Sequence, residues 1–144
     1  MNATTFDPLI VPGTLDSLSP IADYVLAAAR AAGLDVKATY RLRLAVDEIA
    51  TNVISHGYAD AGYVGDVVVR ADFDGQVLIV TLEDTAPPFD PFRRPEPDQV
   101  DLPLEDRPIG GLGVFLAMRG VDEFRYEHDG AHNLNIFVMR GPAR

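Results

Sequence analysis

The sequence predicts an α+β fold: a two-layer α/β sandwich in which helices pack on one face of a mixed, largely antiparallel sheet. Two observations lead to this prediction. The two long segments with helical periodicity lie within residues 19–56, whereas most segments with strand character come later, in two pairs. Each pair is joined by an Asp-Gly turn, at Asp74-Gly75 and at Asp129-Gly130, which is typical of antiparallel hairpins.

The N-terminal part of the chain is predicted to hold one short strand and two helices. The strand is Phe6–Val11. The first helix begins at Ser19-Pro20, with the serine as N-cap and the proline at the first helical position. Apolar residues then recur at helical spacing until Gly33, which ends the helix. Asp35 can cap a second helix that extends to about His56.

The rest of the chain is predicted to hold four strands and one short helix. A proline-rich, charged segment, Pro87–Gly113, separates the two strand pairs and has neither helical nor strand periodicity, so we predict a long mobile loop there. With 144 residues and no repeat or clear linker, the chain is expected to be a single domain. The predicted elements are Val64–Phe73, Val77–Leu82, Glu123–Glu127 and Leu134–Arg140 as strands, and Val114–Val121 as a helix.

Composition excludes several classes of function. The formal net charge of −10 argues against general nucleic-acid binding, which needs lysine and arginine to neutralise phosphates. The acidity fits either a partner with a basic face or simple solubility. The chain has no cysteines, which removes disulfides and thiolate chemistry. No apolar run is long enough to span a bilayer and no secretory signal is present, so we expect a cytoplasmic protein with no membrane contact.

The second predicted helix carries the first candidate site. Glu48 and Asn52 are one turn apart on one flank of its apolar stripe, whereas Asp47 falls on the opposite flank. An asparagine amide oxygen can ligate a hard cation such as Mg²⁺, and a carboxylate can accept a proton from a hydroxyl that attacks a phosphate. The alternative is a solvated pair at the helix surface. The apolar stripe itself consists of Leu42, Val46, Ile49 and Val53.

Two further motifs carry candidate ligand-binding residues. In Glu83–Pro91, a predicted strand ends at Asp84, which can accept a hydrogen bond from an exocyclic amine such as that of adenine. An ordinary proline-rich turn is the alternative. In Ile109–Phe124, three glycines within four residues precede a predicted helix, and such a turn exposes N–H groups to a phosphate. It is not a Walker A loop, and a flexible hinge is the alternative.

Together the motifs DEIATNVISHGY, DTAPPFDP and GGLGVFLAMRGVDEF resemble the GHKL ATPase superfamily. They are most similar to its small serine-kinase branch, the anti-sigma factors of bacterial partner-switching systems. The resemblance extends from the first helix to the last strand. It implies the Bergerat ATP-binding fold, formed by one domain over residues 1–144, with an ATP lid at about residues 91–110.

The resemblance also implies roles for single residues. Asn52 matches the magnesium-coordinating asparagine, and Glu48 the acidic residue proposed as general base. Asp84 matches the aspartate that accepts a hydrogen bond from the adenine amine, and Ala86 stands where many relatives have a glycine and is expected to admit the base. Arg107 would reach the γ-phosphate from the lid. The remaining positions are Gly111, Leu112 and Gly113 at the triphosphate, with Asn133 or Asn135 as the polar residue near adenine.

The function implied is that of a serine/threonine protein kinase and anti-sigma factor that binds ATP and Mg²⁺. The resemblance implies that it phosphorylates a STAS-domain anti-anti-sigma protein, sequesters a sigma factor or another regulated protein, and forms a homodimer. The main alternative is a nucleotide-gated binding protein without kinase activity. A third interpretation, a histidine-kinase-like remnant, is disfavoured because no helix with a phosphoacceptor histidine is present.

Overall fold

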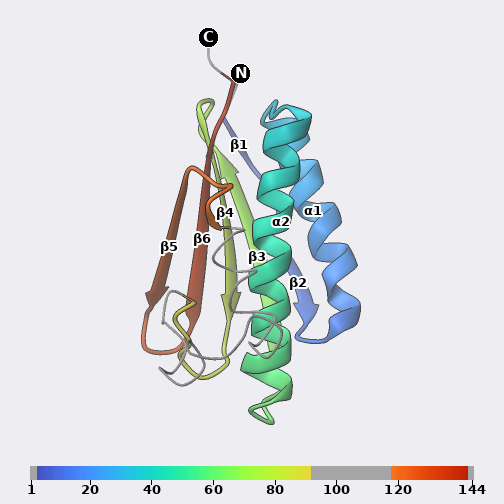
Figure 1. Cartoon of the computed structure of the whole chain (residues 1–144), viewed down its shortest axis with the longest axis vertical. Coiled ribbons are helices and arrows are strands. Elements are labelled where there is room, and N and C mark those ends of the chain that lie inside the picture. Colours follow the sequence, from blue (N-terminus) through green and yellow to red (C-terminus); the bar gives the residue numbers. More distant parts are fainter. Residues whose placement is uncertain (1–2, 92–117, 143–144) are drawn as a thin grey trace, which may run out of the picture.

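The computed structural model describes residues 3–91 and 118–142. It is a two-layer α/β sandwich, in which α1 (Leu18–Ala31) and α2 (Val36–Asn52) lie against a six-stranded sheet (Figure 1). The strand order is β1-β3-β4-β6-β5, and β2 also pairs with β3. Every strand pair within the described residues is antiparallel. The predicted α+β class is therefore confirmed.

The predicted hairpins are present. Gly75 and Gly130 adopt the left-handed backbone conformation, with φ of 98° and 94°, that their tight turns require. Asp74 and Asp129 each accept two backbone hydrogen bonds within their own turn, so local side chains stabilise both connections. The strands are β1 Thr4–Thr5, β2 Leu9–Pro12, β3 Asp66–Phe73, β4 Val77–Asp84, β5 Glu123–His128 and β6 Asn133–Arg140.

Two boundaries in the N-terminal region differ from the prediction. The expected strand Phe6–Val11 is wrong at its start, because the pairing that forms β2 begins only at Leu9. The N-cap prediction for Ser19-Pro20 is also wrong, since a short 3₁₀ helix, η1 (Leu15–Ser17), leads directly into α1 at Leu18. Both residues therefore lie in the first turn of α1, where the missing N–H of proline costs little.

Helix α2 begins as predicted and ends differently. The Asp35 side chain accepts a hydrogen bond of 2.7 Å from the backbone N–H of Ala38, which confirms the N-cap. After Asn52 the helix widens into a π-helix, η2 (Val53–Ala59), instead of ending near His56. Such widened turns are often found at functional sites. Here the change of register falls directly after a candidate site residue.

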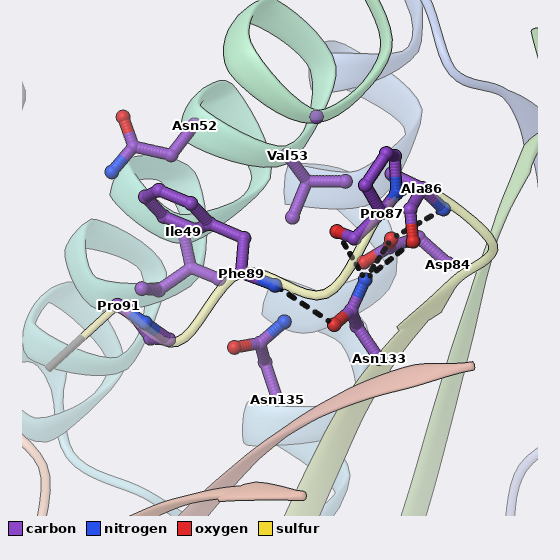
Figure 2. Close-up of a pocket in the computed structure, with 11 residues that line it drawn as sticks. Ile49, Asn52, Val53, Asp84, Ala86, Pro87, Phe89, Pro91, Asn133 and Asn135 are labelled. Atoms are coloured by element: carbon purple, nitrogen blue, oxygen red, sulfur yellow. Dashed lines mark hydrogen bonds between the residues drawn. The ribbon is translucent and has the colours of Figure 1, made fainter. Parts of the chain in front are cut away.

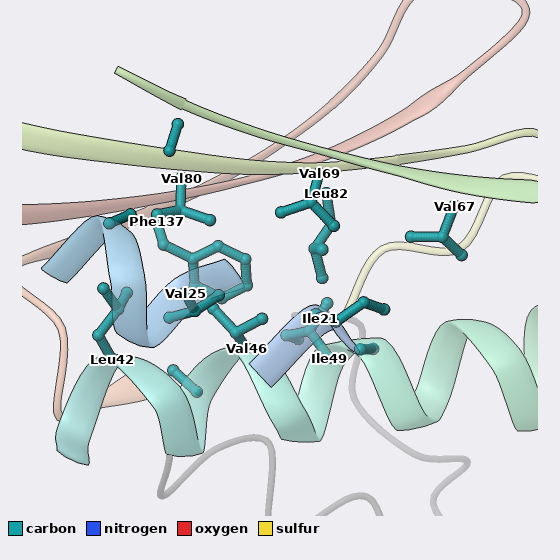
Figure 3. Packing of buried hydrophobic residues seen from close by; sticks show 14 of the residues in the cluster. Ile21, Val25, Leu42, Val46, Ile49, Val67, Val69, Val80, Leu82 and Phe137 are labelled. Atoms are coloured by element: carbon teal, nitrogen blue, oxygen red, sulfur yellow. The ribbon is translucent and has the colours of Figure 1, made fainter. Parts of the chain in front are cut away.

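The core lies between the helices and the facing side of the sheet (Figure 3). The apolar stripe predicted for α2 is buried throughout. It packs with α1 residues and with alternate residues of the central strands, which is the pattern expected for a sheet covered on one face. Labelled members of this core in Figure 3 are Ile21, Val25, Leu42, Val46, Ile49, Val67, Val69, Val80, Leu82 and Phe137.

Tyr58 in η2 ties the end of the helical layer to the sheet. Its hydroxyl donates a hydrogen bond of 2.7 Å to the backbone carbonyl of Asp66 and accepts one of 2.9 Å from the N–H of Thr85. Gly13 and Gly65 lie so close to the ring that a Cβ would approach it to 2.4 and 2.9 Å. This packing fixes the chain immediately after β4.

Most of the loop predicted for Pro87–Gly113, the lid predicted at about residues 91–110, and most of the helix predicted at Val114–Val121 lie outside the described residues. Within the ranges 3–91 and 118–142, none of the helices combines the length and apolar character needed to cross a membrane.

Candidate functional site

A cleft opens between the C-terminal end of α2 and the adjoining ends of β4 and β6 (Figure 2). Two of the three motifs singled out in the sequence meet here, and β6 adds two asparagines. The wall is mainly apolar, with a few polar groups at fixed places, which is the usual composition of a small-molecule site. The lining residues are Ile49, Asn52, Val53, Gly57, Asp84, Ala86, Pro87, Phe89, Pro91, Asn133 and Asn135.

Asp84, the last residue of β4, is the main acceptor in this cleft. Its side chain is buried, and Oδ1 accepts hydrogen bonds from the backbone N–H of Ala86 at 3.0 Å and from Nδ2 of Asn133 at 2.9 Å. Oδ2 is buried as well and has no partner within the described part of the chain. Burial raises the pKa of this carboxyl, while the hydrogen bonds from Asn133 and Ala86 partly oppose that shift.

A buried carboxylate oxygen without a donor is unusual in a folded protein. The free lone pairs of Asp84 Oδ2 are therefore suited to an N–H group of a ligand. Asn135 provides a second acceptor of the same kind: it is 2 % exposed, and its Oδ1 is buried without a partner among the residues described. Two unfilled acceptors in one apolar cleft favour a ligand that carries N–H donors on a flat apolar body, as a purine does.

Asn133 organises this side of the cleft. Its Nδ2 donates to Asp84 and, at 3.0 Å, to the carbonyl oxygen of Ala86. Its Oδ1 accepts hydrogen bonds from the Phe89 N–H at 3.3 Å and from the Tyr126 hydroxyl. One side chain on β6 thus holds the loop that follows β4 and orients the aspartate. Figure 2 shows the hydrogen bonds of Asn133 with Asp84, Ala86 and Phe89 converging on its side chain.

Small residues give the ligand room on the other side. Ala86 is 4 % exposed and lines the cleft. Gly57 of η2 faces it so closely that a Cβ at that position would lie 3.1 Å from the Ala86 Cβ. In Figure 2 the ring of Phe89 points toward α2, near Ile49. Sequence reasoning did not single out Phe89, and only its place in the proline-rich motif could have drawn attention to it.

Asn52 and Glu48 occupy different positions relative to the cleft. Asn52, the last residue of α2, lines the cleft from the helix side, and its amide has no hydrogen-bond partner within the described residues. Glu48 lies one turn earlier, is half-buried, and does not line the cleft itself. Asp47 is turned away and pairs with Arg43 at 3.5 Å.

The described residues contain no cluster of three or more histidine, aspartate or glutamate side chains that could hold a metal ion. Asn52 by itself would suit an ion that takes most of its ligands from water and phosphate oxygens, as Mg²⁺ does. The other residues predicted at the triphosphate lie outside the described residues; they are Arg107, Gly111, Leu112 and Gly113.

The fold and the cleft together define a domain built to hold a small ligand at the edge of a helix-covered sheet. The model of the histidine kinase-like ATPase domain family matches residues 11–139, and the chain belongs to this family. The predicted resemblance is therefore confirmed. Membership of the family implies that ATP is a ligand of the domain.

Among curated proteins, the chain is similar to serine-protein kinases RsbW. It is 32 % identical over 89 residues to that of Halalkalibacterium halodurans, covering 61 % of this chain and 54 % of the relative. It is 27 % identical over 92 residues to that of Bacillus cereus, covering 61 % and 56 %. The chain thus spans a little more than half the length of the curated relatives that it matches.

A crystal structure of the RsbU and RsbW domains of Rv1364c from Mycobacterium tuberculosis has the same fold. It superposes with a TM-score of 0.63 at 19 % sequence identity, covering 96 % of this chain and 34 % of that chain. At this identity the likeness establishes the fold alone.

Proposed function

We propose that this chain is an ATP- and Mg²⁺-dependent serine/threonine protein kinase that acts as an anti-sigma factor in a partner-switching system. The single observation that carries the nucleotide part is Oδ2 of Asp84, which is buried in the lining of an apolar cleft and has no partner in the part of the chain that the structure describes. The similarity to serine-protein kinases RsbW supports the kinase part.

Adenine would be recognised through its exocyclic amine, which would donate to Asp84 Oδ2. Asn133 keeps the aspartate in place for this bond, because it donates to Oδ1 and not to Oδ2. Asn135 Oδ1, the second buried acceptor with no partner among the described residues, would receive a hydrogen bond from the nucleotide or from a water molecule beside it. Ile49 and Val53 supply the apolar wall for the ring.

The phosphates would extend toward the end of α2, where Asn52 offers an amide oxygen. A bound Mg²⁺ would neutralise phosphate charge, and phosphoryl transfer depends mainly on such neutralisation and on positioning. We assign Asn52 to the metal, and Gly111, Leu112, Gly113 and Arg107 to the phosphates, on the family resemblance.

Glu48 would act as the general base. Its carboxylate would accept the proton of a serine or threonine hydroxyl as that oxygen forms a bond to the γ-phosphorus and the bond to the β-phosphate oxygen breaks, releasing ADP. Glu48 is half-buried and does not line the cleft, so an acceptor from another protein would approach it without entering the cleft. Asn52 and Glu48 are one turn apart, which would place metal and base on neighbouring positions.

The proposed substrate is a STAS-domain anti-anti-sigma protein. Phosphorylation adds close to two negative charges to that protein, and this chain already carries a formal charge of −10, so repulsion would favour release of the product. The released kinase would then hold a sigma factor or another regulated protein and so control transcription. We propose that it acts as a homodimer in the cytoplasm, without direct contact with nucleic acid or membrane.

One observation favours a second candidate function. Because Glu48 does not line the cleft, the chain could bind ATP without bringing the carboxylate to the γ-phosphate. It would then be a nucleotide-gated binding protein that sequesters its partner without modifying it.

Intact-mass analysis separates the two candidates. The STAS-domain protein encoded nearest to this chain is incubated with Mg·ATP and with wild type, Glu48→Gln or Asp47→Asn. Asp47 is the matched control, since it is the adjacent carboxylate on the opposite flank and pairs with Arg43. The kinase is supported if wild type and Asp47→Asn both add a phosphate to the STAS-domain protein, and if Glu48→Gln adds it at least a hundredfold more slowly. Bound ATP and a stable complex without transfer would support the binding protein.

A further inference from the structure

An exposed apolar ridge runs along α2 toward the proposed catalytic edge. Val36, Tyr40 and Leu44 follow one another at intervals of four residues, and their exposed fractions are 88 %, 63 % and 41 %. Residues at this spacing are neighbours on a helix surface. Single exposed apolar residues are common, but three consecutive ones on the same row form a continuous surface that water covers unfavourably.

The same row continues into the site. The next position at this spacing is Glu48, which is half-buried, and the one after that is Asn52, which lines the cleft. Along α2, the row therefore begins with exposed apolar side chains, continues with the proposed general base, Glu48, and ends with the proposed metal ligand, Asn52. In Figure 1, α2 covers the sheet and its other side is turned away from the core.

The charge around the ridge is opposite to that of the whole chain. Lys37, Arg41 and Arg43 are all exposed, and the segment Val36–Val46 contains no acidic residue. The chain as a whole carries a formal charge of −10. Arg43 pairs with Asp47, whereas Lys37 and Arg41 have no acidic partner among the described residues. A local basic strip on an acidic protein is suited to an acidic partner surface.

We infer that the Val36–Tyr40–Leu44 ridge is the docking surface for the phosphoacceptor protein, and that the matching face of that protein is an apolar hollow with an acidic rim. This inference rests on the proposed kinase function. A protein that offers a hydroxyl to Glu48 must place its body against the surface that borders this residue, and the ridge begins one turn away at Leu44. Apolar contact would supply affinity, and the basic strip would orient the partner.

The test measures binding of the STAS-domain protein encoded nearest to this chain, by titration calorimetry in the presence of ADP, which prevents turnover. Tyr40→Glu places a carboxylate in the centre of the ridge and is expected to raise the Kd of the complex at least tenfold. Arg41→Glu is expected to raise it as well, and to reduce its dependence on salt concentration. In phosphotransfer assays Tyr40→Glu should raise KM for the acceptor more than it lowers kcat.

Tyr63→Glu is the matched control, because Tyr63 is also an exposed tyrosine (51 %) but lies outside α2. It should bind the STAS-domain protein like wild type. Melting temperature and ATP affinity of each variant show whether the domain is intact. Unchanged partner binding by Tyr40→Glu would overturn the docking surface and leave the kinase proposal standing. Loss of ATP binding in this variant would also overturn it, since the ridge would then support the nucleotide site. Wild type that binds ATP but not the STAS-domain protein would overturn both.

Discussion

Asn133 Nδ2 donates a hydrogen bond of 2.9 Å to Oδ1 of Asp84, and the other carboxylate oxygen of Asp84 is buried with no donor among residues 3–91 and 118–142. The two residues face each other as a register pair of β4 and β6. The asparagine fixes the orientation of the aspartate while it leaves one oxygen available to a ligand.

Asp84→Asn is expected to weaken ATP binding by about 10- to 100-fold. A hydrogen bond to a charged group contributes about 1.5–3 kcal/mol, and the amide can present an NH₂ group where the adenine amine needs an acceptor. Titration calorimetry with ATP measures the effect. Glu83→Gln is the control, because Glu83 precedes Asp84 on β4 but does not line the cleft. Equal affinity of both variants would contradict the assignment of Asp84.

The stability of the nucleotide-free domain should fall as pH rises through the titration of Asp84. Burial raises the pKa of this carboxyl above its ordinary value of 3.8, so the folded state holds a proton that the unfolded chain has already released. More protons are then bound in the folded state, and the free energy of unfolding decreases with pH between the two pKa values.

Asp84→Asn removes this titration. The variant should therefore gain stability relative to wild type as pH rises from about 3.8, and the difference should level off above the folded-state pKa. Urea unfolding across a pH series without nucleotide measures the difference. A gap between the two proteins that does not change with pH would show that the folded-state pKa is not raised.

Ala86→Val is expected to close the cleft. The Gly57 backbone already approaches the Ala86 methyl group closely, so two extra methyl groups have little space and must shift toward the ligand position. ATP affinity should fall at least tenfold, and overpacking should lower the free energy of unfolding by about 1–3 kcal/mol. Ala86→Gly is the matched change, which should keep ATP affinity within a few-fold of wild type. Wild-type affinity of the valine variant for ATP would mean that adenine does not bind beside Ala86.

Tyr58→Phe is expected to destabilise the domain by about 1–3 kcal/mol, because it leaves the Asp66 carbonyl and the Thr85 N–H without their partner. The loop after β4 should also be held less firmly, so ATP affinity should decrease. Urea unfolding and nucleotide titration check both effects. Tyr63→Phe is the control at an exposed tyrosine and should change neither quantity. A fully stable Tyr58→Phe domain would show that the two backbone groups find other partners.

The sequence alone determined the α+β class, the two antiparallel hairpins and the cap of α2. These features depend on interactions between residues close together in the chain: the Asp-Gly turns at residues 74–75 and 129–130, and Asp35 capping three residues ahead. It also singled out Asp84 and Asn52 as candidates, because an acidic residue at a strand end and an amide at a helix end are recognisable locally. The resemblance to a family then followed from the order of these local motifs.

Only the tertiary structure decided how these candidates are arranged. The contact between Asp84 and Asn133 joins residues 49 apart in the sequence, and that between Tyr58 and Thr85 joins residues 27 apart. No local pattern shows which carboxylate oxygen of Asp84 accepts a hydrogen bond from Asn133, because this depends on which side chains fold over the aspartate. Likewise, the prediction of Ser19 as the N-cap was wrong because the helical turns begin earlier, in η1. The Ser17 hydroxyl donates a hydrogen bond of 2.6 Å to the Pro12 carbonyl, and this contact between non-adjacent residues holds the start of the helical segment.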